Sequence, residues 1–271
     1  MTVARRRAGA AAFAALAAWL AGACRSTPAV APAPHEVRYR LAWATPRGPA
    51  SADGAAEITN DLGYRIRIRR GWVTSYSMEL VECPKTSATS AAARAVGLAW
   101  SWLEGTAWAG HSAGTPNPAA IRPMRVESLL EPATRDVGAV ELAPQAYCQV
   151  HYLVARAGRD AQGLPDDLDM VDRTLHVEGT YVAPGASAEI PFTIQSAAAY
   201  GQLFDRAAGA SSALRVDTGR ESVEVTIRRH LDRMFDGVDF ARMPEKAAAL
   251  QMLRSLVDHS DAEVVPSHAN G

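Results

Sequence analysis

The chain of 271 residues has little cysteine, no excess of charge of either sign and almost none of the short motifs that mark catalytic sites. Its 28 basic and 29 acidic side chains give a formal net charge of −1 at pH 7, which excludes the basic surface that nucleic acid requires. The sequence contains no C-x-x-C-H for haem attachment, no glycine-rich phosphate loop and no H-E-x-x-H. Haem, nucleotide and zincin chemistry therefore have no support in the sequence.

The sequence also lacks an apolar run long enough to cross a membrane near its start. The run from Ala8 to Leu20 follows three arginines and is followed by the small residues Ala21-Gly22-Ala23 and then by Cys24. A basic segment, a short apolar segment and a small-residue cleavage site are typical of a secretory signal. We therefore expect residues 1–23 to be a signal peptide that is removed on export.

Cys24 fits two routes of processing. Ala21-Gly22-Ala23 suits ordinary signal peptidase, which would leave plain secretion with a free Cys24 thiol. The segment from Leu20 to Cys24 resembles a bacterial lipobox, in which the cysteine is lipidated, although its leucine stands four residues before the cysteine instead of three. Because residues 24–34 are rich in proline and alanine, they are typical of a tether. The sequence favours a lipid anchor in a membrane of the bacterial envelope, facing the periplasm or the cell surface.

Cys83 and Cys148 are the two cysteines that remain in the exported part. In an oxidising compartment we expect them to form a disulfide between two strands. Thiolate ligation of a metal is the alternative, and it requires reduced sulfur.

Alternation of apolar and polar residues predicts a mainly β fold, an antiparallel β-sandwich over residues 35–243 with a helical insertion and a C-terminal helix. Short one-sided segments are separated by turn-forming residues such as Arg70-Gly71. The strands predicted are 37–43, 64–69, 72–83, 137–142, 147–156, 174–182, 188–195, 213–217 and 222–229.

Two segments favour helices. Residues 87–103 are rich in alanine and predict a helix within a long insertion between strands. In the segment 244–271, Pro244 precedes apolar residues at helical spacing, which predicts a helix over 245–257 with the proline at its first turn. After Asp258 we expect a frayed tail.

Ser112 is the one candidate nucleophile. Gly110-His111-Ser112-Ala113-Gly114 matches G-x-S-x-G, the nucleophile elbow of serine hydrolases. The elbow needs a strand before the serine and a helix directly after it, whereas two prolines follow within 115–118. A serine hydrolase is therefore an alternative function, and a glycine-rich loop is the plainer interpretation of the segment.

Histidines are the candidate ligands for a soft metal in a protein whose cysteines are paired. His111 lies in the Ser112 loop, and His151 and His176 lie in predicted strands, with His151 on a face that alternation directs to solvent. None of the three belongs to an H-x-H, H-x-x-H or H-x-x-x-H pair. A metal site would therefore be assembled from distant strands.

Several segments taken together resemble the MbnP-like, or metallo-mystery-pair, periplasmic proteins and related bacterial lipoproteins. They are Asn60-Asp61-Leu62-Gly63-Tyr64, the end of a strand at Cys83, the loop with His111, Ala146–Tyr152, Gly163-Leu164-Pro165, Thr174–Gly179 and Leu231–Phe240. The resemblance implies a β-sandwich with a copper-related role, often beside a di-haem partner protein that oxidises a tryptophan of its substrate protein.

By this resemblance His111 and His151 are the expected metal ligands, and copper is the expected metal. The relatives carry paired histidines where this chain has Ala109-Gly110-His111. The expected function is a membrane-anchored, non-catalytic lipoprotein that binds copper or a redox partner. The alternatives are a structural or partner-binding lipoprotein without a ligand, and a serine hydrolase that uses Ser112.

Overall fold

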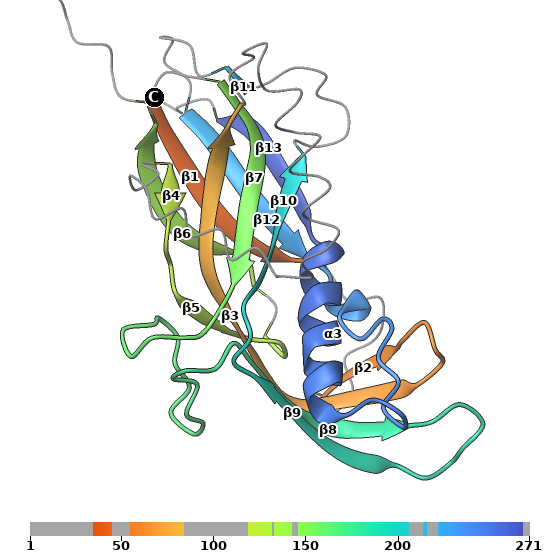
Figure 1. Cartoon of the computed structure of the whole chain (residues 1–271). Helices are drawn as coiled ribbons and strands as arrows, with labels where there is room; N and C mark the ends of the chain where they lie inside the picture. The colour runs from red at the N-terminus through yellow and green to blue at the C-terminus, as the bar shows by residue number, and fades with distance from the viewer. Residues whose placement is uncertain are drawn as a thin grey trace, which may run out of the picture. The chain divides into compact units, whose positions relative to one another are not determined.

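In the part of the chain that the structure describes, alternating segments form two β-sheets, and an α-helix lies near the C-terminus (Figure 1). The structure is a computed structural model that describes residues 35–44, 55–83, 119–131, 133–142, 146–205, 214–215 and 222–267. All of them belong to the second of two compact units of the chain, Pro34–Gly271. The mainly β fold with two mostly antiparallel sheets confirms the predicted fold class.

The smaller sheet combines the first and the last strands of the described chain. Its order is β13-β12-β1-β6. The strands are β1 (His35–Trp43), β6 (Arg135–Leu142), β12 (Ser222–Arg229) and β13 (Asp261–Ser267). β1 runs parallel to β12, with Val37 opposite Val223, whereas the other two pairs in this sheet are antiparallel. The antiparallel arrangement predicted from the sequence therefore has an exception at the centre of this sheet.

The larger sheet is built around one long strand, β3 (Arg65–Glu82). Trp72 of β3 pairs with β5 and also with β8, so β5 and β8 lie on opposite edges of β3. On one edge lie β2 (Ala56–Thr59), β5 (Arg125–Ser128) and β4 (Ala120–Ile121). On the other edge lie β8 (Leu175–Val182) and β7 (Ala146–Val154), flanked by β9 (Ile190–Ser196), β10 (Tyr200–Asp205) and β11 (Leu214–Arg215).

The turn predicted at Arg70-Gly71 is wrong, because β3 continues through both residues. The pairing with β8 shifts register between Ile68 and Arg70, and the strand then carries on. Gly71 is buried, and a Cβ at this position would lie 2.7 Å from Leu129 Cδ1. The glycine therefore makes room for Leu129 in the core and does not reverse the chain.

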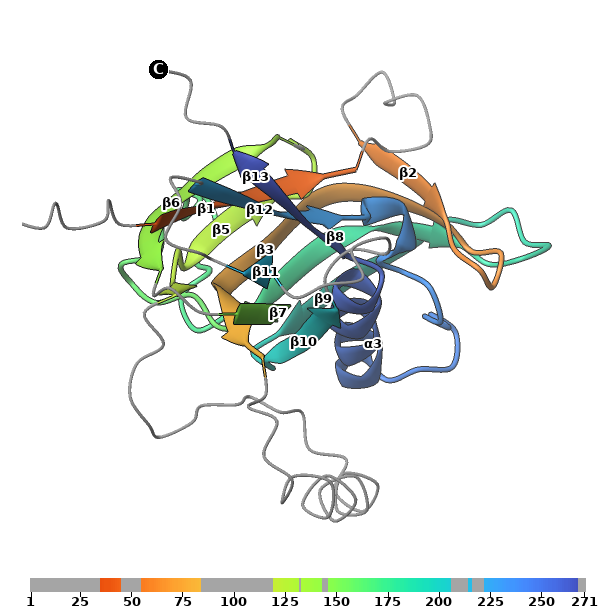
Figure 2. The same ribbon diagram turned by 90° about the horizontal axis from the view of Figure 1, so that it is seen from above.

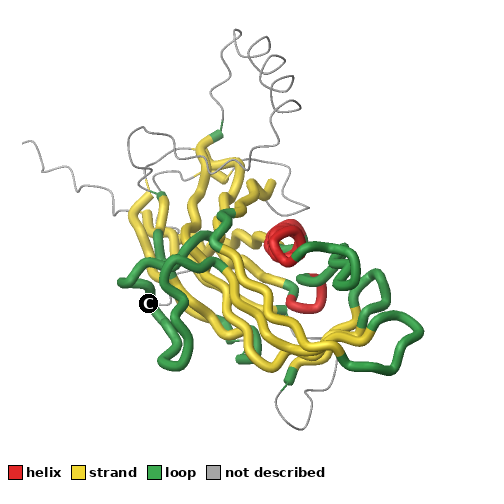
Figure 3. The backbone as a smooth tube through the Cα atoms, turned by 60° about the horizontal axis from the view of Figure 1, so that its bottom comes forward, coloured by secondary structure: helices red, strands yellow, loops and turns green. Residues whose placement is uncertain are grey.

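The two sheets and the helix share one hydrophobic core. Figure 2 shows the helix beside β9 and β10 of the larger sheet. Leu41 of β1, Leu80 of β3 and Met252 of the helix are all fully buried within it. The helix, α3 (Glu245–Asp258), packs against β9 and β10, and the short 3-10 helix η1 (Leu231–Arg233) lies beside it (Figure 3). The smaller sheet and α3 thus both pack against the larger sheet.

The C-terminal helix is confirmed over nearly the range that the sequence predicts. Pro244 stands at the N-cap position with extended ψ, one residue before the helical turn in which it was expected. Beyond Ser260 the predicted frayed tail is replaced by β13, because Ala262 and Val264 alternate toward the core and the strand pairs with β12. The predicted insertion helix at 87–103, the tether at 24–34 and residues 1–23 lie outside the described residues.

Candidate functional site

The segment that carries His111 and Ser112 leaves the larger sheet after Cys83 and returns to it at Ala119. Cys83 is joined by a disulfide to Cys148 of β7, the pairing expected from the sequence, with the two Cα atoms 4.8 Å apart. At the other end, the Tyr39 hydroxyl donates a hydrogen bond to the Ala119 carbonyl. The same hydroxyl accepts the Leu80 N–H at 2.9 Å. Both ends of the segment are therefore fixed to the described sheets.

His151 is the expected metal ligand that the structure describes, and its side chain contacts Glu79. The two residues are directly opposite in β7 and β3, and His151 Nδ1 lies 3.1 Å from Glu79 Oε1. The expectation that His151 points into solvent is wrong, since only 13% of its side chain is exposed. A Cβ on Gly201 of β10 would lie 3.1 Å from His151 Nε2, so the second ring nitrogen faces the backbone of the neighbouring strand.

The register of the sheet relates this pair to the His111 segment. Glu79 is opposite His151 on one edge of β3 and opposite Ala120 of β4 on the other. The segment therefore rejoins the sheet one strand away from the His151–Glu79 pair. His111 and Ser112 themselves, like Cys24, lie outside the described residues.

His176 and Glu178 share a face of β8, as their alternation in the sequence predicts. His176 Nε2 lies 2.7 Å from Glu178 Oε1, while the buried Nδ1 has no hydrogen-bond partner among the described residues. The imidazole lies beside Trp72, with ring centroids 6.4 Å apart. Arg70 covers the same indole at 5.2 Å and forms an ion pair with Asp167 at 2.6 Å. This cluster fixes Trp72 in one position on the larger sheet.

A buried ion pair between Arg229 and Glu127 is the polar cluster that the sequence does not reveal. Arg229 at the end of β12 is fully buried, and Glu127 of β5 is 7% exposed. The guanidinium donates from Nη1 to Glu127 Oε2 at 2.5 Å and from Nη2 to Oε1 at 2.9 Å. Arg229 therefore connects the smaller sheet to the larger one by a bidentate contact, the strongest geometry for such a pair.

The surroundings of this pair satisfy it further. Ser75 Oγ accepts from Arg229 Nη1 at 3.2 Å and lies 2.8 Å from the Tyr152 hydroxyl. The guanidinium carbon lies 4.1 Å from the centroid of the Trp43 ring, a cation–π contact. Burial lowers the pKa of Arg229, but the charges and hydrogen bonds of Glu127 and Tyr152 together outweigh burial and raise the pKa above its ordinary value. Arg229 therefore keeps its positive charge in the folded protein.

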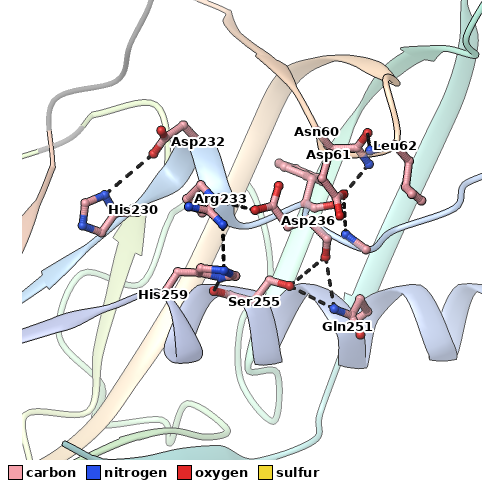
Figure 4. A network of polar contacts seen from close by, with 12 residues as sticks. Asn60, Asp61, Leu62, His230, Asp232, Arg233, Asp236, Gln251, Ser255 and His259 are labelled. Carbon is pink, nitrogen blue, oxygen red and sulfur yellow. Dashed lines mark hydrogen bonds and ion pairs between the residues drawn. The ribbon is translucent and has the colours of Figure 1, made fainter.

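The turn between β2 and β3 is fastened to the chain that leads into α3 (Figure 4). Asn60 Nδ2 donates to the carbonyls of Phe235 and Val238 at 3.1 and 2.9 Å, and the Gly237 N–H donates to Asp61 Oδ1 at 2.7 Å. These hydrogen bonds join the Asn60–Tyr64 segment to the Leu231–Phe240 segment, so the two segments hold each other in place.

Tyr64 and Asp239 add a further link at this point. The Tyr64 hydroxyl donates to Asp239 Oδ1 at 2.6 Å. This hydrogen bond holds the pKa of Asp239 below its ordinary value and raises the pKa of Tyr64. The carboxylate form of Asp239 is therefore stabilised in the folded protein.

At the end of α3, the His259 ring lies between Arg233 and the Ser255 carbonyl (Figure 4). Arg233 Nη2 lies 2.9 Å from His259 Nε2, and His259 Nδ1 lies 2.9 Å from the Ser255 carbonyl. Because a guanidinium can only donate, Arg233 is the donor in its contact with Nε2. This network connects η1 to the end of α3.

Among the residues that the structure describes, no group of three or more histidine, cysteine, aspartate or glutamate side chains could hold a metal ion. No helix in the same part of the chain is both long and apolar enough for a membrane span. Comparisons with models of protein families, with curated proteins and with solved structures find no match for this chain.

Proposed function

We propose that this protein is a lipid-anchored, non-catalytic protein of the bacterial envelope that binds copper through His151 and His111. The observation that carries the proposal is the contact of His151 with Glu79. Metal-binding histidines commonly direct one ring nitrogen at a carboxylate, which orients the imidazole and makes the other nitrogen a better ligand. His151 Nδ1 has such a partner in Glu79 at 3.1 Å.

The position of the segment 84–118 supports the same proposal. His111 lies in this segment, which rejoins the sheet at the register position of Glu79. A second ligand from there would complete a site that His151 begins, in keeping with the resemblance to MbnP-like proteins. Imidazole is a ligand that suits copper among the first-row transition metals.

Export and anchoring rest on two features. The segment before Cys24 has the composition of a signal peptide with a lipobox-like end. The bonded pair Cys83–Cys148 is the state expected of cysteines in an oxidising compartment. Incorporation of labelled palmitate into the wild-type protein, and its loss in Cys24→Ala, tests the anchor.

The test of copper binding is a titration of the chain from residue 35 onward, followed by metal analysis after desalting. Wild-type protein is expected to retain one copper ion per chain, and His151→Ala and His111→Ala are each expected to lose it. His230→Ala is the matched control, because His230 pairs with Asp261 at the end of β12 and is expected to change nothing. Retention of copper by both test variants contradicts the proposed site.

The alternative of a partner-binding lipoprotein without a ligand predicts no copper uptake by the wild-type protein. The serine hydrolase alternative predicts labelling by a fluorophosphonate probe that Ser112→Ala abolishes. Both measurements use the same purified protein, so they separate the three functions directly.

A further inference from the structure

A polar cavity of about 330 Å³ lies beside β5, away from the His151–Glu79 pair. The side chains that matter for its chemistry are Trp72, Arg125, Val126, Glu127, Glu131 and Arg135. A cavity of this size accommodates one small organic molecule. Its wall combines an aromatic surface with charges of both signs.

Three of these side chains are held in place by contacts behind the cavity wall. Trp72 is covered by Arg70, which Asp167 in turn fixes at 2.6 Å. Glu127 is held by the bidentate contact from Arg229. Arg125 donates to Gln162 Oε1 at 2.5 Å. A wall fixed in this way loses little side-chain entropy when a ligand enters, which is the property of a preorganised binding site.

The charges in the wall favour an anion. Glu127 does not repel one, because both of its oxygens are taken by Arg229. The remaining charged side chains are Arg125, Arg135 and Glu131, which leave a net charge of +1 (two positive, one negative). Coulomb attraction therefore favours an anion, and a single negative charge neutralises the wall.

Donors for such a ligand remain available. Arg125 Nε is buried and has no hydrogen-bond partner among the described residues. The side chain of Arg135 forms no ion pair or hydrogen bond with any residue in the described ranges. Guanidinium groups bind carboxylates through paired N–H donors, and Trp72 offers an apolar surface next to them.

We propose that this cavity binds a small organic monocarboxylate, whose carboxylate contacts Arg125 and Arg135 and whose apolar group packs on Trp72 and Val126. The site is independent of the copper site proposed above. Its ligand is defined by one negative charge and one compact apolar group.

Isothermal titration of the purified full chain with sodium phenylacetate tests the proposal, with phenethylamine as a probe of the same apolar group and opposite charge. Phenylacetate is expected to bind and phenethylamine is not. Arg125→Gln and Arg135→Gln are each expected to weaken binding about tenfold or more, the effect of losing one charge-assisted hydrogen bond. Arg242→Gln is the matched control, because its side chain is 88% exposed in a loop outside the cavity, and it should leave binding unchanged.

Glu131→Gln removes the one uncompensated negative charge and is expected to tighten binding of phenylacetate, a gain that misfolding cannot produce. Far-UV circular dichroism establishes that the two arginine variants are folded. The proposal is overturned if phenylacetate does not bind at millimolar concentration, if phenethylamine binds equally well, or if both arginine variants bind as the wild type does.

Discussion

The buried ion pair between Arg229 and Glu127 gives the sharpest quantitative prediction. Glu127→Gln keeps the shape of the side chain but removes the charge that neutralises Arg229, which has no exposed surface. Removing one partner of a buried pair costs about 3–5 kcal/mol, because the remaining charge stays buried without compensation. Ser75 and the Trp43 ring still contact the guanidinium, and neither carries a negative charge.

The assay is equilibrium unfolding in urea and by heat, with the disulfide intact. For a domain of this size each kcal/mol corresponds to about 2–4 °C, so Glu127→Gln is expected to lower Tm by about 6–20 °C. The matched control is Glu263→Gln, because Glu263 pairs with Arg228, the neighbour of Arg229, at 3.1 Å with both side chains 47% exposed. Exposed pairs contribute at most about 1 kcal/mol, so this control should shift Tm by no more than a few degrees.

The double variant Glu127→Gln/Arg229→Met completes the test. Replacing a buried pair by apolar or neutral groups is often neutral in stability, so the second substitution is expected to recover much of the loss caused by the first. Equal losses for Glu127→Gln and Glu263→Gln would refute the argument that burial makes the Arg229 pair different.

Two further predictions concern the hydrogen bond between Tyr64 and Asp239 and the disulfide between Cys83 and Cys148. Tyr64→Phe is expected to raise the pKa of Asp239 toward its ordinary value, measured by NMR titration of the carboxyl carbon. Because the folded-state pKa of Asp239 is lowered, its contribution to stability is present above about pH 4 and lost as the pH falls through the folded-state pKa. The difference in Tm between wild type and Tyr64→Phe should therefore shrink in acid, and a difference that grows there contradicts the assignment. Cys83→Ser/Cys148→Ser opens a link between residues 65 apart and is expected to cost about 4 kcal/mol in urea unfolding. Reduced wild-type protein should show the same loss, and an unchanged midpoint in the double variant speaks against it.

The strands that alternate cleanly were predictable from the sequence, because alternation is a local signal, whereas β2, β4, β5 and β10 were not predicted. Residues 222–229 alternate cleanly and form β12, and the helix after Pro244 forms at helical spacing. The pattern of β12 also contained a signal for the buried arginine, since Arg229 has the same parity as Val223, Val225 and Ile227. A charged residue in the apolar series of a strand indicates either a strand end or a buried partner, and only the structure distinguishes them.

The features that could not be predicted from the sequence depend on contacts between residues far apart in the chain. Glu127 lies in a strand of four residues, too short for alternation to separate a buried side from an exposed one. The burial of His151 depends on its pairing with Glu79, which is set by the register of β3 against β7. The parallel pairing of β1 with β12 has no local signature at all.

That parallel pairing has a consequence for how the polypeptide matures. Because Val37 is opposite Val223, the smaller sheet cannot assemble until nearly all of the described chain has left the ribosome. A topology with such non-local contacts folds slowly, because the chain loses the entropy of loop closure before the stabilising contacts form. The smaller sheet is therefore expected to be among the last parts of the described fold to form, and the exposed edge of β1 has to wait for β12.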